Sequence, residues 1–192
     1  MEELTPEIRH WSAVHPDIEW AVSSYWLPSL GILLDPLDVP DEVEGVEQIV
    51  LSNRHHRRSA FDASERFGAV VRVPCLGLHE FEGDPVEPYD FGEPLVGGAI
   101  TAYQVTELWP DEGALHIPSL DALAIADAVL NEDGRLGWMP DYCFGDLPAE
   151  QRSIRAGLGR LAAELEFSHL LLAHGDPLAG DGRERLREFA GG

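Results

Sequence analysis

Between residues 46 and 73 an apolar strand, a polar run, an amphipathic helix and a second apolar strand follow one another. The strands are predicted at 46–52 and 69–73, and the helix at 59–67, where Gly68 closes it. A helix that joins two strands of one sheet normally leaves those strands parallel. This unit predicts an α/β fold in which at least part of one sheet is parallel.

Other apolar segments extend this pattern along the chain. Strands are predicted at 18–27, 31–36, 99–107, 114–117, 122–125 and 169–173, and helices at 148–165 and 181–189. Residues 1–17 are expected to form an irregular lead-in, 37–45 an acidic loop, and 75–98 turns with short strands. The order of elements indicates a two-layered α/β design with helices outside, in one domain over residues 1–192.

The charge of the chain excludes several kinds of partner. It carries 35 acidic residues against 13 arginines, has no lysine, and has a formal net charge of −22. Such a chain repels nucleic acid and anionic membranes. No apolar run approaches the roughly 20 residues of a membrane span, and the start does not resemble a secretory signal. Cys75 and Cys143 form no CxxC pair, so we expect two buried thiols in a cytoplasmic protein of undetermined oligomeric state.

Polar residues directly follow three of the predicted strands. These positions are the run from Asn53 to Arg58, then Asp127, then His174. Ligand sites of α/β proteins gather at strand ends, so we expect these side chains to share one site. If strand alternation continues into the run, His55 points into this site and His56 points away.

Four segments, in this order, resemble the metallo-β-lactamase superfamily: YWLPSLGILLDPL, IVLSNRHHRRSA, LAIADAVL and HLLLAHGDPLAGDGRERLREF. The resemblance covers residues from about 20 to 189. It implies a four-layer αββα sandwich of two mixed sheets with helices outside. It also implies a hydrolase that binds metal, because the second segment matches the His-x-His-x-Asp-His signature of that superfamily.

The match to the signature is incomplete. Asn53 stands where the superfamily has its first His, Arg57 where it has Asp, and Arg58 where it has the last His. No His occurs near Leu108–Pro110, where another ligand belongs. The resemblance therefore implies a degenerate metal site that retains His55, the bridging Asp127 and the final His174.

Three hypotheses remain open for this site, and with them the question of whether the chain is an enzyme. In the first, Arg57 or Arg58 pairs with Asp127 in place of metal, and Arg54, Arg57, Arg58 and Asn53 bind a small anion. In the second, His55, Asp127 and His174 hold one zinc or iron, with His79 as an extra ligand or base, and catalyse hydrolysis through Asp127 and His55. In the third, the cleft is filled and the protein is structural.

Overall fold

The computed structural model describes residues 1–191, and most of their strands belong to two sheets. The first sheet has seven strands in sequence order: β1 (Glu2–Thr5), β2 (Ile8–Val14), β3 (Ala21–Leu27), β4 (Ile32–Leu34), β5 (Gln48–Val50), β6 (Val70–Pro74) and β7 (Val86–Tyr89). Strands β1 to β4 pair antiparallel, and β4 to β7 pair parallel. This sheet is therefore mixed.

The second sheet is also mixed. Its order is β14 (His169–Leu172), β11 (Ala122–Ile125), β10 (Gly113–Ile117), β9 (Ile100–Gln104) and β8 (Pro94–Leu95). Only the β11–β14 pair is parallel. A separate hairpin joins β12 (Leu130–Glu132) to β13 (Arg135–Gly137).

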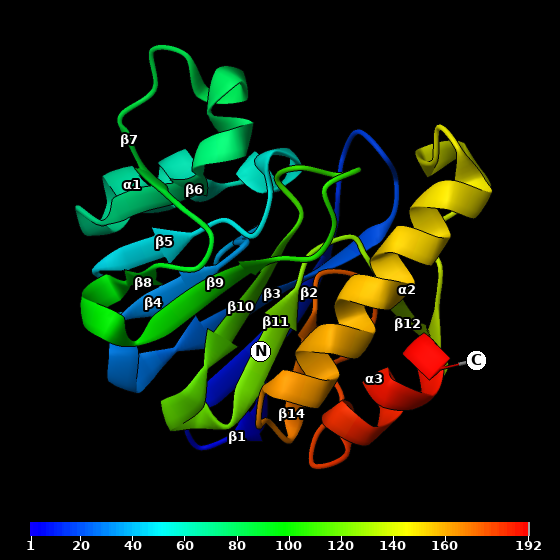
Figure 1. Cartoon of the computed structure of the whole chain (residues 1–192). Helices are drawn as coiled ribbons and strands as arrows, with labels where there is room; N and C mark the ends of the chain where they lie inside the picture. Colours follow the sequence, from blue (N-terminus) through cyan, green and yellow to red (C-terminus); the bar gives the residue numbers. More distant parts are fainter. Residues whose placement is uncertain (192) are drawn as a thin grey trace.

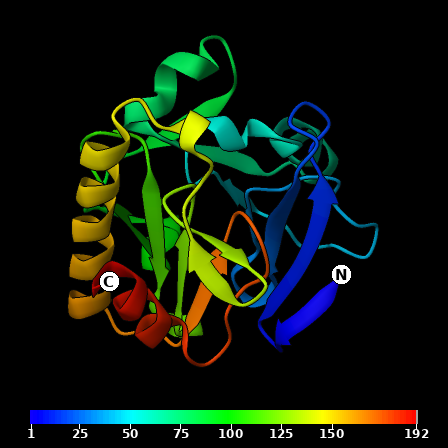
Figure 2. The ribbon, with the colours of Figure 1, turned by 90° about the vertical axis from the view of Figure 1, so that its right-hand side faces the viewer.

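In the described part of the chain, three α-helices cover the outer faces of the sheets. Helix α1 (Ala60–Phe67) packs on the first sheet, and α2 (Leu147–Glu164) and α3 (Gly182–Gly191) pack together on the second (Figures 1 and 2). Asp146 caps α2, because its side chain accepts a hydrogen bond from the Ala149 N–H. Among residues 1–191 no helix combines the length and the apolar character needed to cross a membrane.

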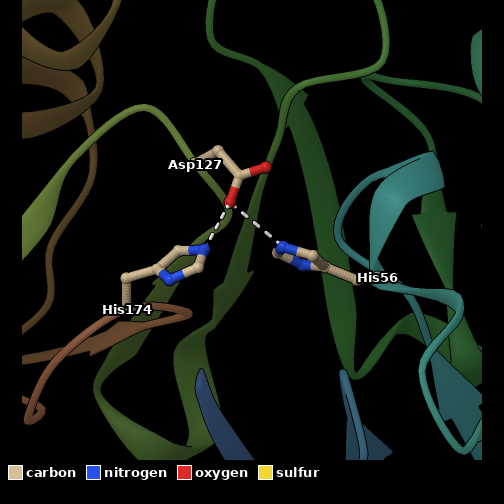
Figure 3. Close-up of side chains that lie close together, drawn as sticks. All are labelled: His56, Asp127 and His174. Atoms are coloured by element: carbon tan, nitrogen blue, oxygen red, sulfur yellow. Dashed lines mark hydrogen bonds and ion pairs between the residues drawn. The ribbon is translucent and has the colours of Figure 1, made fainter. Parts of the chain in front are cut away.

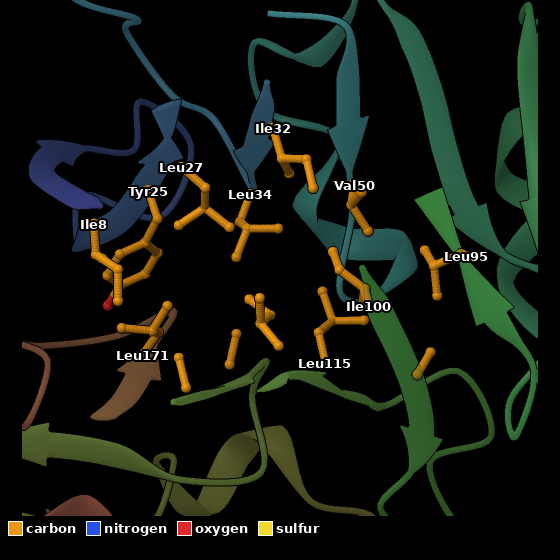
Figure 4. Close-up of a cluster of buried hydrophobic side chains, with 14 of the residues drawn as sticks. Ile8, Tyr25, Leu27, Ile32, Leu34, Val50, Leu95, Ile100, Leu115 and Leu171 are labelled. Carbon is orange, nitrogen blue, oxygen red and sulfur yellow. The ribbon is translucent and has the colours of Figure 1, made fainter. Parts of the chain in front are cut away.

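The main core lies between the two sheets. Its side chains come from both of them, as Figure 4 shows for Tyr25, Leu34 and Val50 of the first sheet and Leu115 and Leu171 of the second. Two further clusters fill the spaces between each sheet and its helices. The layers therefore run helix, sheet, sheet, helix. The predicted four-layer sandwich of two mixed sheets with helices outside is confirmed.

The strand–helix–strand unit over residues 46–73 is present as predicted. Strands β5 and β6 pair parallel with Ile49 opposite Val71, and α1 connects them. Gly68 ends α1 in the left-handed conformation, with φ of 69°. Strong apolar runs on both sides of one amphipathic helix were enough to identify this unit.

The expected irregular lead-in over residues 1–17 is wrong, because β1 lies there as an edge strand of the first sheet and β2 lies between β1 and β3. The inward positions of β2 include His10, which is buried and lies 3.1 Å from the Ser23 Oγ. A polar residue at a buried position hides the alternation that identifies a strand. The expectation of two buried thiols is also wrong: Cys75 and Cys143 are exposed at the ends of short turns.

Candidate metal centre

Two of the site residues lie side by side because their strands are parallel neighbours. In the β11–β14 pair Ile125 is opposite Leu172. Asp127 and His174 each follow two residues later, at the same edge of the sheet. Parallel pairing therefore brings together side chains that are 47 residues apart in the chain.

The third residue reaches the site from the first sheet. After β5 the chain enters a 3₁₀ turn over Arg54–Arg57, and Asn53 caps this turn. The Asn53 Oδ1 accepts hydrogen bonds from the backbone N–H groups of His55, at 2.9 Å, and His56, at 3.1 Å. The turn brings the His56 Nε2 to within 3.1 Å of the Asp127 Oδ1, just past the end of β11.

His56, Asp127 and His174 converge on one point (Figure 3). The Asp127 Oδ1 lies 3.1 Å from the His56 Nε2 and 3.0 Å from the His174 Nε2. One ligand atom from each residue lies within 4.8 Å of the others. Both histidines are buried, and Asp127 is only partly exposed. We call these three residues the triad.

Other side chains hold the triad from behind. The His56 Nδ1 lies 3.0 Å from the Asp35 Oδ2 and 2.9 Å from the Ser52 Oγ, and the Ser52 N–H donates to the Asp35 Oδ1 at 2.8 Å. The Asn53 Nδ2 donates to the Asp127 Oδ2 at 2.8 Å. Asp127 therefore has one oxygen fixed by Asn53 and the other directed at the two imidazoles.

The charges in this network stabilise one another. Burial and Arg58 each lower the pKa of His56, but Asp35 and Asp127 outweigh them and raise it to about 9. Burial alone would raise the pKa of Asp127, but His56 and His174 hold that pKa well below its usual range. The protein without metal therefore contains an anionic Asp127 beside a cationic His56.

The predicted orientation of the two adjacent histidines is wrong. His56 is buried in the triad, whereas His55 is exposed and lines the neighbouring cleft. The prediction assumed that strand alternation continues past Ser52. A 3₁₀ turn has three residues per turn, so the residue three after Asn53 returns to the same side.

The predicted pair between Asp127 and Arg57 or Arg58 is also wrong. Arg57 is exposed, pairs with Asp84 and lies over the Phe61 ring. Arg58 turns behind the triad, where its buried guanidinium donates to the backbone oxygens of Ser23 and Asp35, both at 2.8 Å. The two guanidinium groups are therefore engaged elsewhere, and the partners of Asp127 are Asn53 and the two histidines of the triad.

The other residues expected at the site are dispersed. Arg54 pairs with Asp111, so its charge is largely neutralised at the mouth of the cleft. The Asn53 side chain accepts a hydrogen bond from the backbone of the turn and donates one to Asp127. His79 is exposed beside Glu80, 3.7 Å away, and is not part of the triad. Of the four proposed anion ligands, only Arg54 and Asn53 line the cleft.

An open cleft of about 320 Å³ leads to Asp127; we call it the triad cleft. Leu108, Trp109 and Met139 form its apolar wall, and His55 and Glu112 are among its polar residues. This cavity argues against the hypothesis of a structural protein with a filled cleft. Apolar walls around a few polar groups are typical of small-molecule sites.

Sequence reasoning missed Asp35 and Glu112. Glu112 is buried, and its Oε1 accepts a hydrogen bond from the Ala128 N–H at 2.6 Å. Burial, and then Asp127, raise the pKa of Glu112 well above its usual range. The strand predicted at 31–36 includes Asp35, and the prediction gave this residue no role. Its position just after an apolar strand was the available signal.

The triad fits one metal ion. Two imidazole nitrogens and a carboxylate are a donor set typical of non-haem iron and also suit zinc. The Asp35 carboxylate on the second nitrogen of His56 matches the support that metal-binding histidines usually have. Within residues 1–191 this is the one cluster of three or more such side chains close enough to share an ion.

Comparison with protein-family models gave no match. Comparison with curated proteins gave none either.

Solved structures do match, over nearly the whole chain. The DIM-1 metallo-β-lactamase superposes with a TM-score of 0.72 at 13% identity, covering 99% of this chain and 95% of that one. A metallo-β-lactamase family protein of Thermus thermophilus, TTHA1429, superposes with a TM-score of 0.63 at 18% identity, covering 98% of this chain and 79% of that one. The di-iron-bound form of TTHA1623 gives 0.66 at 18% identity over 93% and 99%.

Proposed function

Because the chain has the metallo-β-lactamase fold, we propose that it is a hydrolase with a single zinc or iron ion held by His56, Asp127 and His174. The proposed substrates are esters, thioesters or related small molecules. The observation that carries the proposal is the convergence of three ligand atoms within 4.8 Å beside an open cleft. The di-iron form of a neighbour of this fold supports iron beside zinc as the metal to test.

Each residue of the site has a separate task in this proposal. A bound divalent ion supplies Lewis acidity and lowers the pKa of water at such sites. Asp35 orients His56, and Asn53 orients Asp127, so that the triad is preformed before metal binds. Trp109 and Met139 provide an apolar wall against which a substrate packs.

The deciding measurement is the metal content of protein purified without chelator or affinity metal. We expect close to one zinc or iron per chain by elemental mass spectrometry. Hydrolysis of p-nitrophenyl butyrate or of S-butyryl-N-acetylcysteamine should disappear with a chelator and return with metal. Activity that persists in fully chelated protein would contradict the proposal.

A second candidate function is favoured by the hydrogen bonds of Asp127. Asn53, His56 and His174 together satisfy this carboxylate without any ion. A homologue that has lost catalysis needs no more than this network. Its cleft would bind a small anion at His55 and at the Arg54 guanidinium N–H groups other than Nη1, which pairs with Asp111. No metal after soaking with zinc and with iron(II), together with binding of phosphate or acetate, is the outcome that selects this candidate.

Replacing Asp35 tests the support behind His56. We expect Asp35→Asn to weaken metal affinity roughly 10- to 100-fold, because supporting carboxylates typically contribute that much. Asn tolerates the left-handed backbone at this position, where φ is 45°. Chelator competition measures the affinity. Asp84→Asn, which removes a carboxylate paired with Arg57 outside the triad, is the matched control. Equal affinities in the two variants would rule out this role for Asp35.

A further inference from the structure

The segment that carries His174 is bonded to the first sheet, although His174 follows β14 of the second sheet. Its partners lie on β3. Strand β4 ends at Leu34, which pairs with Tyr25, and no strand of the described chain pairs with β3 on that side before Tyr25. Ser23 lies in this unpaired stretch and is buried. This side of β3 is therefore free to bind the chain that leaves β14.

Ser23 binds the backbone on both sides of His174. Its N–H donates to the Ala173 oxygen at 2.8 Å, and its Oγ donates to the Gly175 oxygen, also at 2.8 Å. The oxygen of His174 itself accepts a hydrogen bond from the Asn131 N–H at 3.1 Å. All three carbonyl groups from 173 to 175 are engaged, and Ser23 supplies two of the donors. One residue of the first sheet therefore fixes the backbone from which the His174 ring projects.

The surroundings of this segment leave it little freedom. Gly175 has φ of 83°, and a Cβ there would lie 1.9 Å from the Asn131 backbone oxygen. Before His174, the Leu172 N–H donates to the Tyr25 hydroxyl at 2.9 Å, and that hydroxyl donates to the Leu172 oxygen at 2.7 Å. Ligand side chains must be held to within about 0.5 Å of their working geometry. Bonds from β3 give the His174 segment such a fixed position.

His10 orients the Ser23 hydroxyl. Its Nε2 lies 3.1 Å from the Ser23 Oγ. A hydroxyl has one proton, and the Ser23 hydroxyl donates it to Gly175, so the His10 Nε2 donates to the Oγ. Burial lowers the pKa of His10, which favours the neutral ring. His10, Ser23 and Gly175 therefore form a directed chain of two hydrogen bonds that ends beside His174.

The backbone oxygen of Ser23 belongs to the other side of the triad. It accepts a hydrogen bond from the Arg58 Nη1 at 2.8 Å, and the same nitrogen donates to the Asp35 oxygen. Arg58 lies two residues after His56, and the Asp35 carboxylate contacts the His56 ring. Ser23 therefore connects the segment of His174 to that of His56, and the two segments come from different sheets.

We propose that Ser23 positions His174 for metal binding by holding the carbonyl groups of Ala173 and Gly175 in place. The proposal rests on the proposed metal site and assigns to it a positioning residue outside the triad. Partners that orient metal-binding histidines typically contribute 10- to 100-fold to metal affinity. Because Ser23 acts on the backbone and not on the ring, we expect an effect at the lower end of that range.

Ser23→Ala tests this role, because it removes the bond to Gly175 and keeps the backbone bonds to Ala173 and Arg58. We expect zinc affinity, measured by chelator competition, to be about tenfold weaker. The visible absorption of cobalt(II)-loaded protein, which reports the geometry of the ligands, should also change. Ser23→Thr keeps the hydroxyl and suits a strand, so it should recover the zinc affinity to within about threefold of wild type.

The effect of Ser23→Ala on the backbone can be measured without metal. The Asn131 N–H is bonded to the His174 oxygen, so in the metal-free variant its hydrogen exchange should be about tenfold faster than in wild type. Circular dichroism should show both proteins folded. Unchanged exchange at Asn131 would contradict a role of Ser23 in holding this segment.

Ser64→Ala is the matched control. The Ser64 Oγ donates to the Ala69 oxygen at 2.7 Å, next to the end of α1 and outside the triad. The substitution removes the same kind of hydrogen bond and should leave the zinc affinity and the cobalt spectrum unchanged. Equal zinc affinities of Ser23→Ala and Ser64→Ala would overturn the role of Ser23 and leave the metal site standing. Wild-type protein that binds no zinc would instead refute the proposed metal site, and this inference with it.

Discussion

Asp127→Asn is expected to leave a folded chain that no longer holds metal. Asp127 is the only anionic member of the triad, and its Oδ1 is the atom on which both imidazoles converge. An amide keeps the shape of the side chain but removes the charge that attracts a divalent ion. Bound metal should fall from close to one per chain to less than a tenth. Metal-dependent hydrolysis should fall at least a hundredfold.

The controls for Asp127→Asn separate loss of the site from loss of the fold. Circular dichroism should show unchanged secondary structure, because the main core between the sheets does not include Asp127. Asp84→Asn removes a carboxylate outside the triad and should retain full metal content. A variant that keeps its metal and its hydrolytic activity would show that the triad is not the metal site.

Gly157→Ala should be the most destabilising single-methyl change in α2. A Cβ at this position would lie 1.8 Å from the Val105 backbone oxygen, where no flexible side chain can move aside. The helix must therefore shift off the second sheet, at a cost of about 3 kcal/mol. For a chain of this size the melting temperature should fall on the order of 10 °C.

The same helix provides an internal control of opposite sign. At Gly159 the nearest heavy atom to an added Cβ is the Ala190 Cβ, at 3.5 Å, which is an ordinary contact. Gly159→Ala should therefore gain about 0.5–1 kcal/mol from helix propensity. Urea titration of both variants measures the difference. Similar stabilities of the two variants would mean that α2 does not pack on Val105 as closely as described.

The sequence allowed most strands and helices to be located. Long apolar runs such as 122–125 and 169–173 became β11 and β14 with ends within one residue of those predicted. The failures have local causes. Strand β2 buries the polar His10, which interrupts its apolar alternation. Strands β12 and β13 have three residues each, which is too short to show an apolar pattern.

The site divides in the same way. Asp127 and His174 were predicted because each directly follows a strong strand and matches a superfamily motif, and the structure brings them together. His56 and Asp35 were not predicted. Strand alternation predicts the orientation of neither side chain. His56 lies in a 3₁₀ turn, and Asp35 has a left-handed backbone conformation.

Two of the arginines form ion pairs with acids that lie far from them in the sequence. Arg57 pairs with Asp84, 27 residues away, and Arg54 with Asp111, 57 residues away. Neither acid could be chosen among the 35 of this chain before the fold was known. The prediction that an arginine pairs with Asp127 in place of a metal was wrong for this reason.

The sequence by itself determined which segments are buried, because apolar periodicity is a local property. It also determined that two of the three triad residues lie at strand ends. Only the tertiary structure decided which histidine turns inward, which acids neutralise the arginines, and that Ser23 of β3 binds the backbone on both sides of His174. These outcomes depend on contacts between residues distant in the chain, and the free energy of such contacts exists only once the layers have packed.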